Sequence, residues 1–74
     1  MNAKQNKAMV ERTRERYKVG TRVELVFTED RHTNLKPGEQ GTVSCVDDMG
    51  TVFIDWDSGS GLGMIPSVDE IRII

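Results

Sequence analysis

Several residue types are scarce in this sequence of 74 residues, and each shortage excludes a class of protein. With one cysteine and one histidine, the chain forms no internal disulfide and assembles no Cys/His zinc cluster. It has no apolar run of the ~20 residues that a membrane-spanning helix needs, and none of signal-peptide length near residue 1. We therefore expect a cytoplasmic protein in a reducing compartment, with no membrane partner, no metal and no other cofactor.

The formal net charge of −2 is divided unevenly along the chain. Residues 1–16 carry five basic and two acidic residues, a net of +3, whereas residues 17–74 carry five basic and ten acidic residues, a net of −5. An acidic body repels a phosphate backbone, so any contact with nucleic acid is expected from the basic leader. Its basic residues are Lys4, Lys7, Arg12, Arg14 and Arg16.

The leader and the remainder of the chain follow different patterns. Residues 2–16 lack glycine and proline and are rich in good helix formers, which predicts a helix. A lone helix of this length is marginal in water, so we expect it to order only against the rest of the chain or a partner. We divide the chain into a basic, helical leader at 1–16 and a β domain at 17–74.

From Tyr17 onward, apolar residues alternate with polar ones, which predicts strands. Five are expected, at 21–27, 40–46, 51–57, 61–65 and 70–74, with a tight hairpin at 47–50 and one helical turn at 66–69. Together with the long loop at 28–39, this plan predicts a mainly β fold, a five-stranded SH3-like small barrel with a short N-terminal helix. The expected inward side chains include Val23, Leu25, Phe27, Val43, Cys45, Val52, Ile54 and Trp56.

Four short motifs occur in a fixed order along the β domain: KPGEQGTV at 36–43, VDDxG at 46–50, WDxGSxL at 56–62 and IPxVD at 65–69. Over residues 17–74 the chain therefore resembles the small bacterial and phage family known as domain of unknown function 4314. Ser58 stands where the family pattern usually has asparagine, and Gly61 and Gly63 replace residues with side chains. The resemblance implies an SH3-like barrel carried on phages, plasmids and conjugative elements, and it implies no established activity.

The glycines at 59, 61 and 63 form neither of the usual phosphate-binding loops. A dinucleotide fingerprint needs a glycine at position 64, where Met64 stands, and a P-loop needs a Gly-Lys-Ser/Thr run. We interpret the stretch as a turn that leads into a bent strand.

The acidic residues and the lone cysteine favour structural roles. Asp55 and Asp57 share the outward face of one strand, but the chain has no calcium-loop spacing. Asp57 and Asp69 are expected to bind backbone N–H groups in turns. His32 has no nucleophile nearby in the sequence and Cys45 has inward parity, so we predict that the protein is not an enzyme.

The aromatic residues suggest where a partner would bind. Trp56 has the inward parity of its strand, which predicts a core position, with an exposed platform as the alternative. Phe53 has outward parity, so it is covered either by Met9 and Val10 of the leader or by a partner.

The preferred hypothesis is a protein-interaction module that uses the loop at 28–39 and the turn at 58–63 as one rim. We expect a monomer or a weak homodimer with a protein partner. Nucleic-acid binding by the leader is the alternative, and inhibition of a host factor is one form that binding takes in phage proteins. The expected binding residues are Tyr17, Arg31, Phe53, Trp56, Asp57, Leu62 and Met64.

Overall fold

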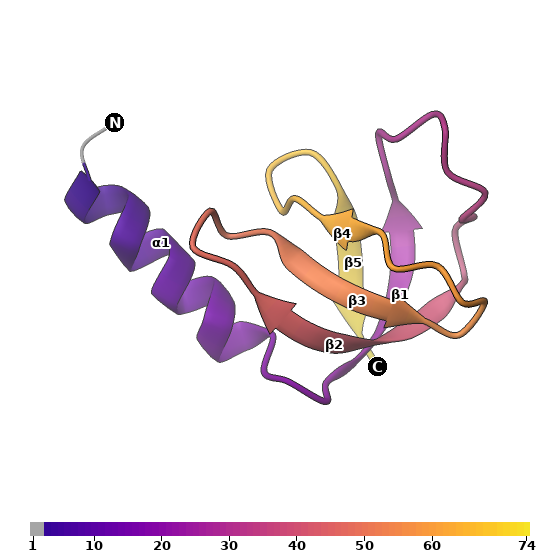
Figure 1. Ribbon diagram of the computed structural model, residues 1–74, viewed down its shortest axis with the longest axis horizontal. Helices are drawn as coiled ribbons and strands as arrows, with labels where there is room; N and C mark the ends of the chain where they lie inside the picture. Colours follow the sequence, from indigo (N-terminus) through magenta and orange to yellow (C-terminus); the bar gives the residue numbers. More distant parts are fainter. Residues whose placement is uncertain (1–2) are drawn as a thin grey trace.

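The fold is one antiparallel sheet with a single helix at one end (Figure 1). The computed structural model describes residues 3–74, with side chains from Lys7 onward. The strand order is β4-β3-β2-β1-β5. The elements are α1 (Ala3–Arg16), β1 (Arg22–Phe27), β2 (Gln40–Val46), β3 (Val52–Trp56), β4 (Gly63–Met64) and β5 (Glu70–Ile73).

The mainly β architecture is confirmed, with each expected strand present and only the fourth much shorter than predicted. β4 and β5 occupy the two edges of the sheet, and within residues 3–74 they do not pair with each other. The sheet is therefore open along one seam. No helix in the described residues has both the length and the apolar composition to cross a bilayer.

The core lies on one face of the curled sheet, where alternate residues of neighbouring strands meet. On β3 the predicted parity is confirmed, because Val52, Ile54 and Trp56 are all buried and Phe53 between them is 36% exposed. Val23 and Leu25 of β1 join the same cluster. The indole N–H of Trp56 donates to the Leu62 carbonyl at 2.9 Å, so its one polar atom is satisfied inside the core.

Two residues that were predicted to point inward are exposed. Phe27 is 52% exposed, and the pairing of β1 with β5 shifts register between Leu25 and Phe27. Cys45 is also exposed, and the pairing of β2 with β3 shifts register between Val43 and Cys45. The prediction was wrong for both because an inserted residue sends the side chains that follow it to the opposite face.

The helix packs against the hairpin between β2 and β3. Val10 is 8% exposed, and its Cγ2 lies 3.6 Å from the place that a Cβ on Gly50 would occupy. Arg14 donates from Nη2 to Asp48 Oδ1 at 2.8 Å and from Nε to the Val46 carbonyl at 3.2 Å. The leader is therefore ordered against the sheet, as expected. The tight hairpin predicted at 47–50 is also present, and Gly50 has a positive φ of 85° in it.

Candidate functional site

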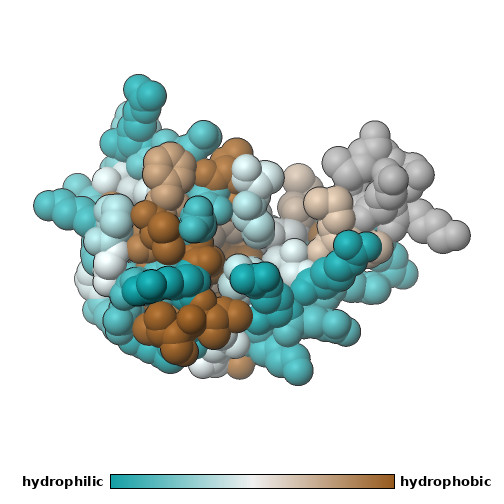
Figure 2. Space-filling model, turned by 180° about the vertical axis from the view of Figure 1, so that it is seen from behind, coloured by the Kyte–Doolittle hydropathy of each residue, from teal (hydrophilic) through white to brown (hydrophobic). Residues whose placement is uncertain are grey.

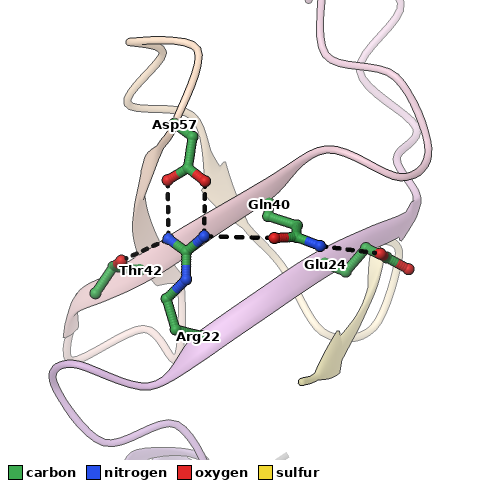
Figure 3. Close-up of polar contacts among 5 residues, drawn as sticks. All are labelled: Arg22, Glu24, Gln40, Thr42 and Asp57. Atoms are coloured by element: carbon green, nitrogen blue, oxygen red, sulfur yellow. Dashed lines mark hydrogen bonds and ion pairs between the residues drawn. The ribbon is translucent and has the colours of Figure 1, made fainter.

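The outer face of the sheet carries a row of polar side chains centred on Arg22 (Figure 3). Nη1 and Nη2 of Arg22 donate to Oδ1 and Oδ2 of Asp57 at 2.8 and 2.6 Å, and Nη1 also donates to Thr42 Oγ1 at 2.9 Å. Longer bonds of 3.5 Å continue the row to Gln40 and from Gln40 to Glu24. The row connects side chains of β1 and β2 with Asp57, the residue that follows β3.

The charges of this pair stabilise each other. The hydrogen bonds from Arg22, with its positive charge, hold the pKa of Asp57 below its ordinary value, and the same bonds raise the pKa of Arg22. The carboxylate of Asp57 therefore does not cap a turn, and that prediction was wrong. Because each group already has its partner, the row is a structural clamp rather than an open binding site.

The other aspartate fulfils its predicted role. Asp69 accepts bonds from the backbone N–H groups of Glu29 and Ile65, each at 2.9 Å, and from the hydroxyl of Thr28 at 2.9 Å. This confirms that the Asp69 carboxylate binds backbone donors. It joins the start of the long loop to the turn that precedes β5.

The long loop at 28–39 and the turn between β3 and β4 lie close together. The two segments together line a pocket of about 400 Å³. Its walls consist mainly of short polar side chains, and the buried member of its lining is Leu35, which was not predicted as a core residue. The lining residues are Thr33, Asn34, Leu35, Glu39, Ser58 and Ser60.

The seven predicted binding residues do not form one surface. Tyr17, Trp56 and Met64 belong to the buried core, and Leu62 packs against it, so this group is brought together inside the molecule. Asp57 is bound to Arg22 and Arg31 is exposed in the long loop. Phe53 remains partly exposed.

The basic residues of the leader also divide. Arg14 is held by Asp48, and Lys7 is exposed. The side chain of Lys4 lies outside the described residues. Arg12 and Arg16 instead line a groove that runs between α1 and β5.

This groove, of about 690 Å³, lies at the open seam of the sheet. Met64 comes from β4, and Ile71 and Ile73 come from β5, so the two unpaired edges form its floor together with Tyr17. The walls are charged. The lining residues are Arg12, Thr13, Arg16, Tyr17, Met64, Pro66, Asp69, Glu70, Ile71, Arg72 and Ile73.

Two arginines bring positive charge to one wall of the groove. The ion pairs among residues 7–74 are Arg14–Asp48, Arg22–Asp57 and Arg72–Glu24, and they involve neither Arg12 nor Arg16. The Arg16 guanidinium carbon lies 5.5 Å from the centre of the Tyr17 ring, a cation–π contact. This wall therefore presents two cations without a carboxylate partner in the described part of the chain.

Exposed apolar side chains continue beyond the groove, as the band of brown atoms in Figure 2 shows. Single apolar residues are normal on a protein surface, but five exposed apolar residues of this chain lie on or next to β5, on its partner β1 or in the turn before β5. These five residues, each 40–52% exposed, are Phe27, Ile65, Val68, Ile73 and Ile74.

Within residues 7–74, no three histidine, cysteine, aspartate or glutamate side chains gather closely enough to hold a metal ion. His32 lies in the long loop, where its backbone N–H donates to Asp30 Oδ1 at 2.8 Å. Cys45 is exposed on β2.

The groove was not predicted from the sequence as a site. Arg12 and Arg16 are four residues apart and hence on one face of the predicted helix, which is a usable signal. No short-range pattern in the sequence shows that this face of α1 lies beside β5, or that β4 and β5 do not pair.

A family model described as a domain of unknown function (DUF4314) matches residues 6–74. The match starts inside α1, so it includes most of the helix as well as the sheet. No curated protein matches the chain.

Proposed function

The chain belongs to the family described as a domain of unknown function (DUF4314), and from its surface we propose that it is a small, non-enzymatic protein-interaction module. The groove between α1 and β5 is the binding site in this proposal. The observation that carries it is the combination, in one groove, of an apolar floor, an unpaired strand edge and the two arginines Arg12 and Arg16.

The chemistry of the groove supports binding rather than catalysis. Its lining, among the described residues, contains neither histidine nor cysteine, two of the common catalytic side chains. The groove is instead bounded by a strand edge and a helix, which is a common setting for recognition of a peptide segment.

The proposal includes the SH3-like architecture. The strand order, the long loop after β1 and the turn at residues 65–69 before β5 support a small barrel that is open between β4 and β5. Full closure would remove these edges. In this proposal the open seam is the functional feature, because it leaves the edge of β5, with Ile71 and Ile73, beside the groove.

Site-specific photo-crosslinking tests the proposal. A photoreactive phenylalanine analogue placed at Glu70, in the groove, is expected to crosslink a protein in a lysate of the source cells, and the product should survive nuclease treatment. The same analogue at Asp55, exposed on β3, serves as the control. The substitution Arg12→Glu should abolish the Glu70 product, and equal products from both positions would contradict the proposal.

Nucleic-acid binding is the second candidate, and the unpaired arginines favour it. Arg12 and Arg16, together with the exposed Lys7, would contact phosphates. Three such contacts predict that the logarithm of the binding constant falls with the logarithm of salt concentration with a slope of about −3. A gel-shift series from low to high salt measures this slope. If the chain binds only proteins, as in the first proposal, it should give no shift at any salt concentration.

A further inference from the structure

The outer edge of β5 has backbone groups that point away from the sheet. β5 pairs antiparallel with β1, with Ile73 opposite Val23 and Arg72 opposite Glu24. The N–H of Ile74 donates to the Arg22 carbonyl at 3.0 Å. Hydrogen-bonded pairs alternate along an antiparallel ladder, so the next bonded pair is Arg72 with Glu24.

It follows that the N–H and C=O groups of Ile71 and Ile73 point to the other side, toward the groove that these residues line. β5 holds the edge position of the sheet in the described residues, so no strand takes up these groups. Such an edge is a template for another strand. Here α1 and the turn at residues 65–69 flank the edge without pairing with it.

The charges beside this edge favour one chemistry for the strand. Asp69 and Arg72, which also line the groove, are bound by other groups of the chain, which leaves Arg12, Arg16 and Glu70 with a net charge of +1. Arg12 and Arg16 are separated by four helical residues, a rise of about 6 Å. Alternate residues on one face of an extended strand are separated by about 6.8 Å. Carboxylates at positions i and i+2 of a strand therefore match the spacing of the two arginines.

We propose that the groove binds an extended, acidic segment of a partner protein, which adds to the free edge of β5 as a further strand. This inference rests on the proposed function and names the partner that it needs. A second copy of the chain is a poorer match, because its own β5 offers Glu70 and Arg72, a pair without net charge, and leaves Arg12 and Arg16 without a counter-charge.

The test is an NMR titration of the full ¹⁵N-labelled chain with a capped heptapeptide of alternating valine and glutamate. Strand addition should shift the amide signals of Ile71 and Ile73 downfield and slow their exchange with solvent, since both amides gain an acceptor. The matched peptide with lysine in place of glutamate should bind roughly tenfold more weakly or not at all. A version methylated on alternate backbone nitrogens, those that face β5, should also fail.

Variants separate charge from backbone pairing. The double substitution Arg12→Gln and Arg16→Gln should weaken the glutamate peptide roughly tenfold, whereas Lys7→Gln, which removes a charge from α1 outside the groove, should leave its affinity unchanged. Ile73→Pro removes one N–H from the free edge without removing a bond to β1. It should abolish peptide binding while the amide signals of β2 and β3 keep their positions.

The outcomes distinguish this inference from the proposed function. If the groove residues respond equally to the glutamate, lysine and methylated peptides, the groove binds peptides but strand addition by an acidic segment is wrong. If no peptide perturbs the groove at millimolar concentration, both are wrong. If Ile71 and Ile73 become protected with rising protein concentration alone, and light scattering gives a dimer, the occupant is a second copy and the inference is overturned.

Discussion

Gly41 shows how closely the strands approach at a single residue. A Cβ built on Gly41 would lie 2.5 Å from Cγ2 of Ile54 and 2.9 Å from the Asp55 carbonyl oxygen. Those distances are shorter than any van der Waals contact, and one of the atoms belongs to the backbone. β2 and β3 can therefore pair in the observed register only with glycine at this position.

The first prediction is that Gly41→Ala destabilises the fold by about 1–3 kcal/mol, because β2 and β3 must separate to admit the methyl group. Urea unfolding followed by tryptophan fluorescence measures the change. Gly61→Ala is the matched control, since no atom lies within 4 Å of its Cβ position, and its effect should stay within about 0.5 kcal/mol. Equal losses at the two positions would contradict the steric argument.

The second prediction concerns pH and the Arg22–Asp57 pair. The pKa of Asp57 is lower in the folded than in the unfolded chain. Its carboxylate therefore stabilises the fold at pH values above the pKa that aspartate has in the unfolded chain, about 4. That contribution is lost as the pH falls below 4 toward the folded pKa. The stability difference between the native chain and Asp57→Asn should therefore shrink between pH 5 and pH 3, as measured by urea unfolding.

The control for this prediction removes the partner. In an Arg22→Gln background the Asp57 carboxylate has lost the guanidinium that lowers its pKa. The effect of Asp57→Asn should then be nearly independent of pH over the same range. A pH dependence that persists without Arg22 would assign the lowered pKa to another cause.

At the scale of elements, α1 depends on its contact with the β2–β3 hairpin. A helix of 14 residues is marginal in isolation, and Val10 is its buried anchor over Gly50. The ion pair of Arg14 with Asp48 is exposed and contributes little by comparison.

The third prediction is that Val10→Ala destabilises the chain by roughly 1–2 kcal/mol and loosens α1 before the sheet unfolds. Circular dichroism at 222 nm should fall at lower urea concentration than tryptophan fluorescence changes. Met9→Ala, at the neighbouring exposed position, is the control and should leave the two transitions together. If Val10→Ala also keeps them together, the helix and the sheet unfold as one unit.

For the whole molecule, the open seam sets an order of stability across the sheet. β2 is paired on both sides, whereas β5 is paired only with β1 among the described strands. Peripheral elements of this kind open locally at lower free energy than the centre of a sheet. The same openness leaves the groove beside the edge of β5.

The fourth prediction follows from that order and concerns the unbound chain. The amide of Arg72 is bonded to β1, and those of Ile71 and Ile73 point outward, so Arg72 should exchange at least about tenfold more slowly than its two neighbours. Amides at the centre of β2 and β3 should exchange more slowly still. Hydrogen–deuterium exchange followed by NMR measures all three classes, and a protected Ile71 or Ile73 would show that the edge is already covered.

Much of the secondary structure was predictable because its determinants are local. The alternation of β3, the glycine turn at Gly50 and the bond from the Ile65 N–H to the Asp69 carboxylate all depend on residues a few positions apart. The alternating pattern predicted the wrong side of the sheet for Phe27 and Cys45, because the bulge before each of them depends on how the partner strand pairs. Leu35 was missed because its burial arises from packing of a polar loop onto the core.

The site was less predictable than the fold. The sequence placed Arg12 and Arg16 among the basic residues of a predicted helix, and it predicted a short final strand that includes Ile71 and Ile73. It placed the binding surface on the loops, and three of the chosen side chains are buried in the core. The groove needs contacts between segments more than 50 residues apart, and no short-range pattern records them.

The sequence by itself determined a single mainly β domain with a basic helical leader, because composition, alternation and turn residues act over short distances. Only the tertiary structure decided that Arg22 clamps Asp57, that α1 rests on the β2–β3 hairpin, and that β4 and β5 remain apart. Each of these depends on the order and register of strands, which are set by packing across the whole sheet. The groove at the open seam is the consequence of that packing.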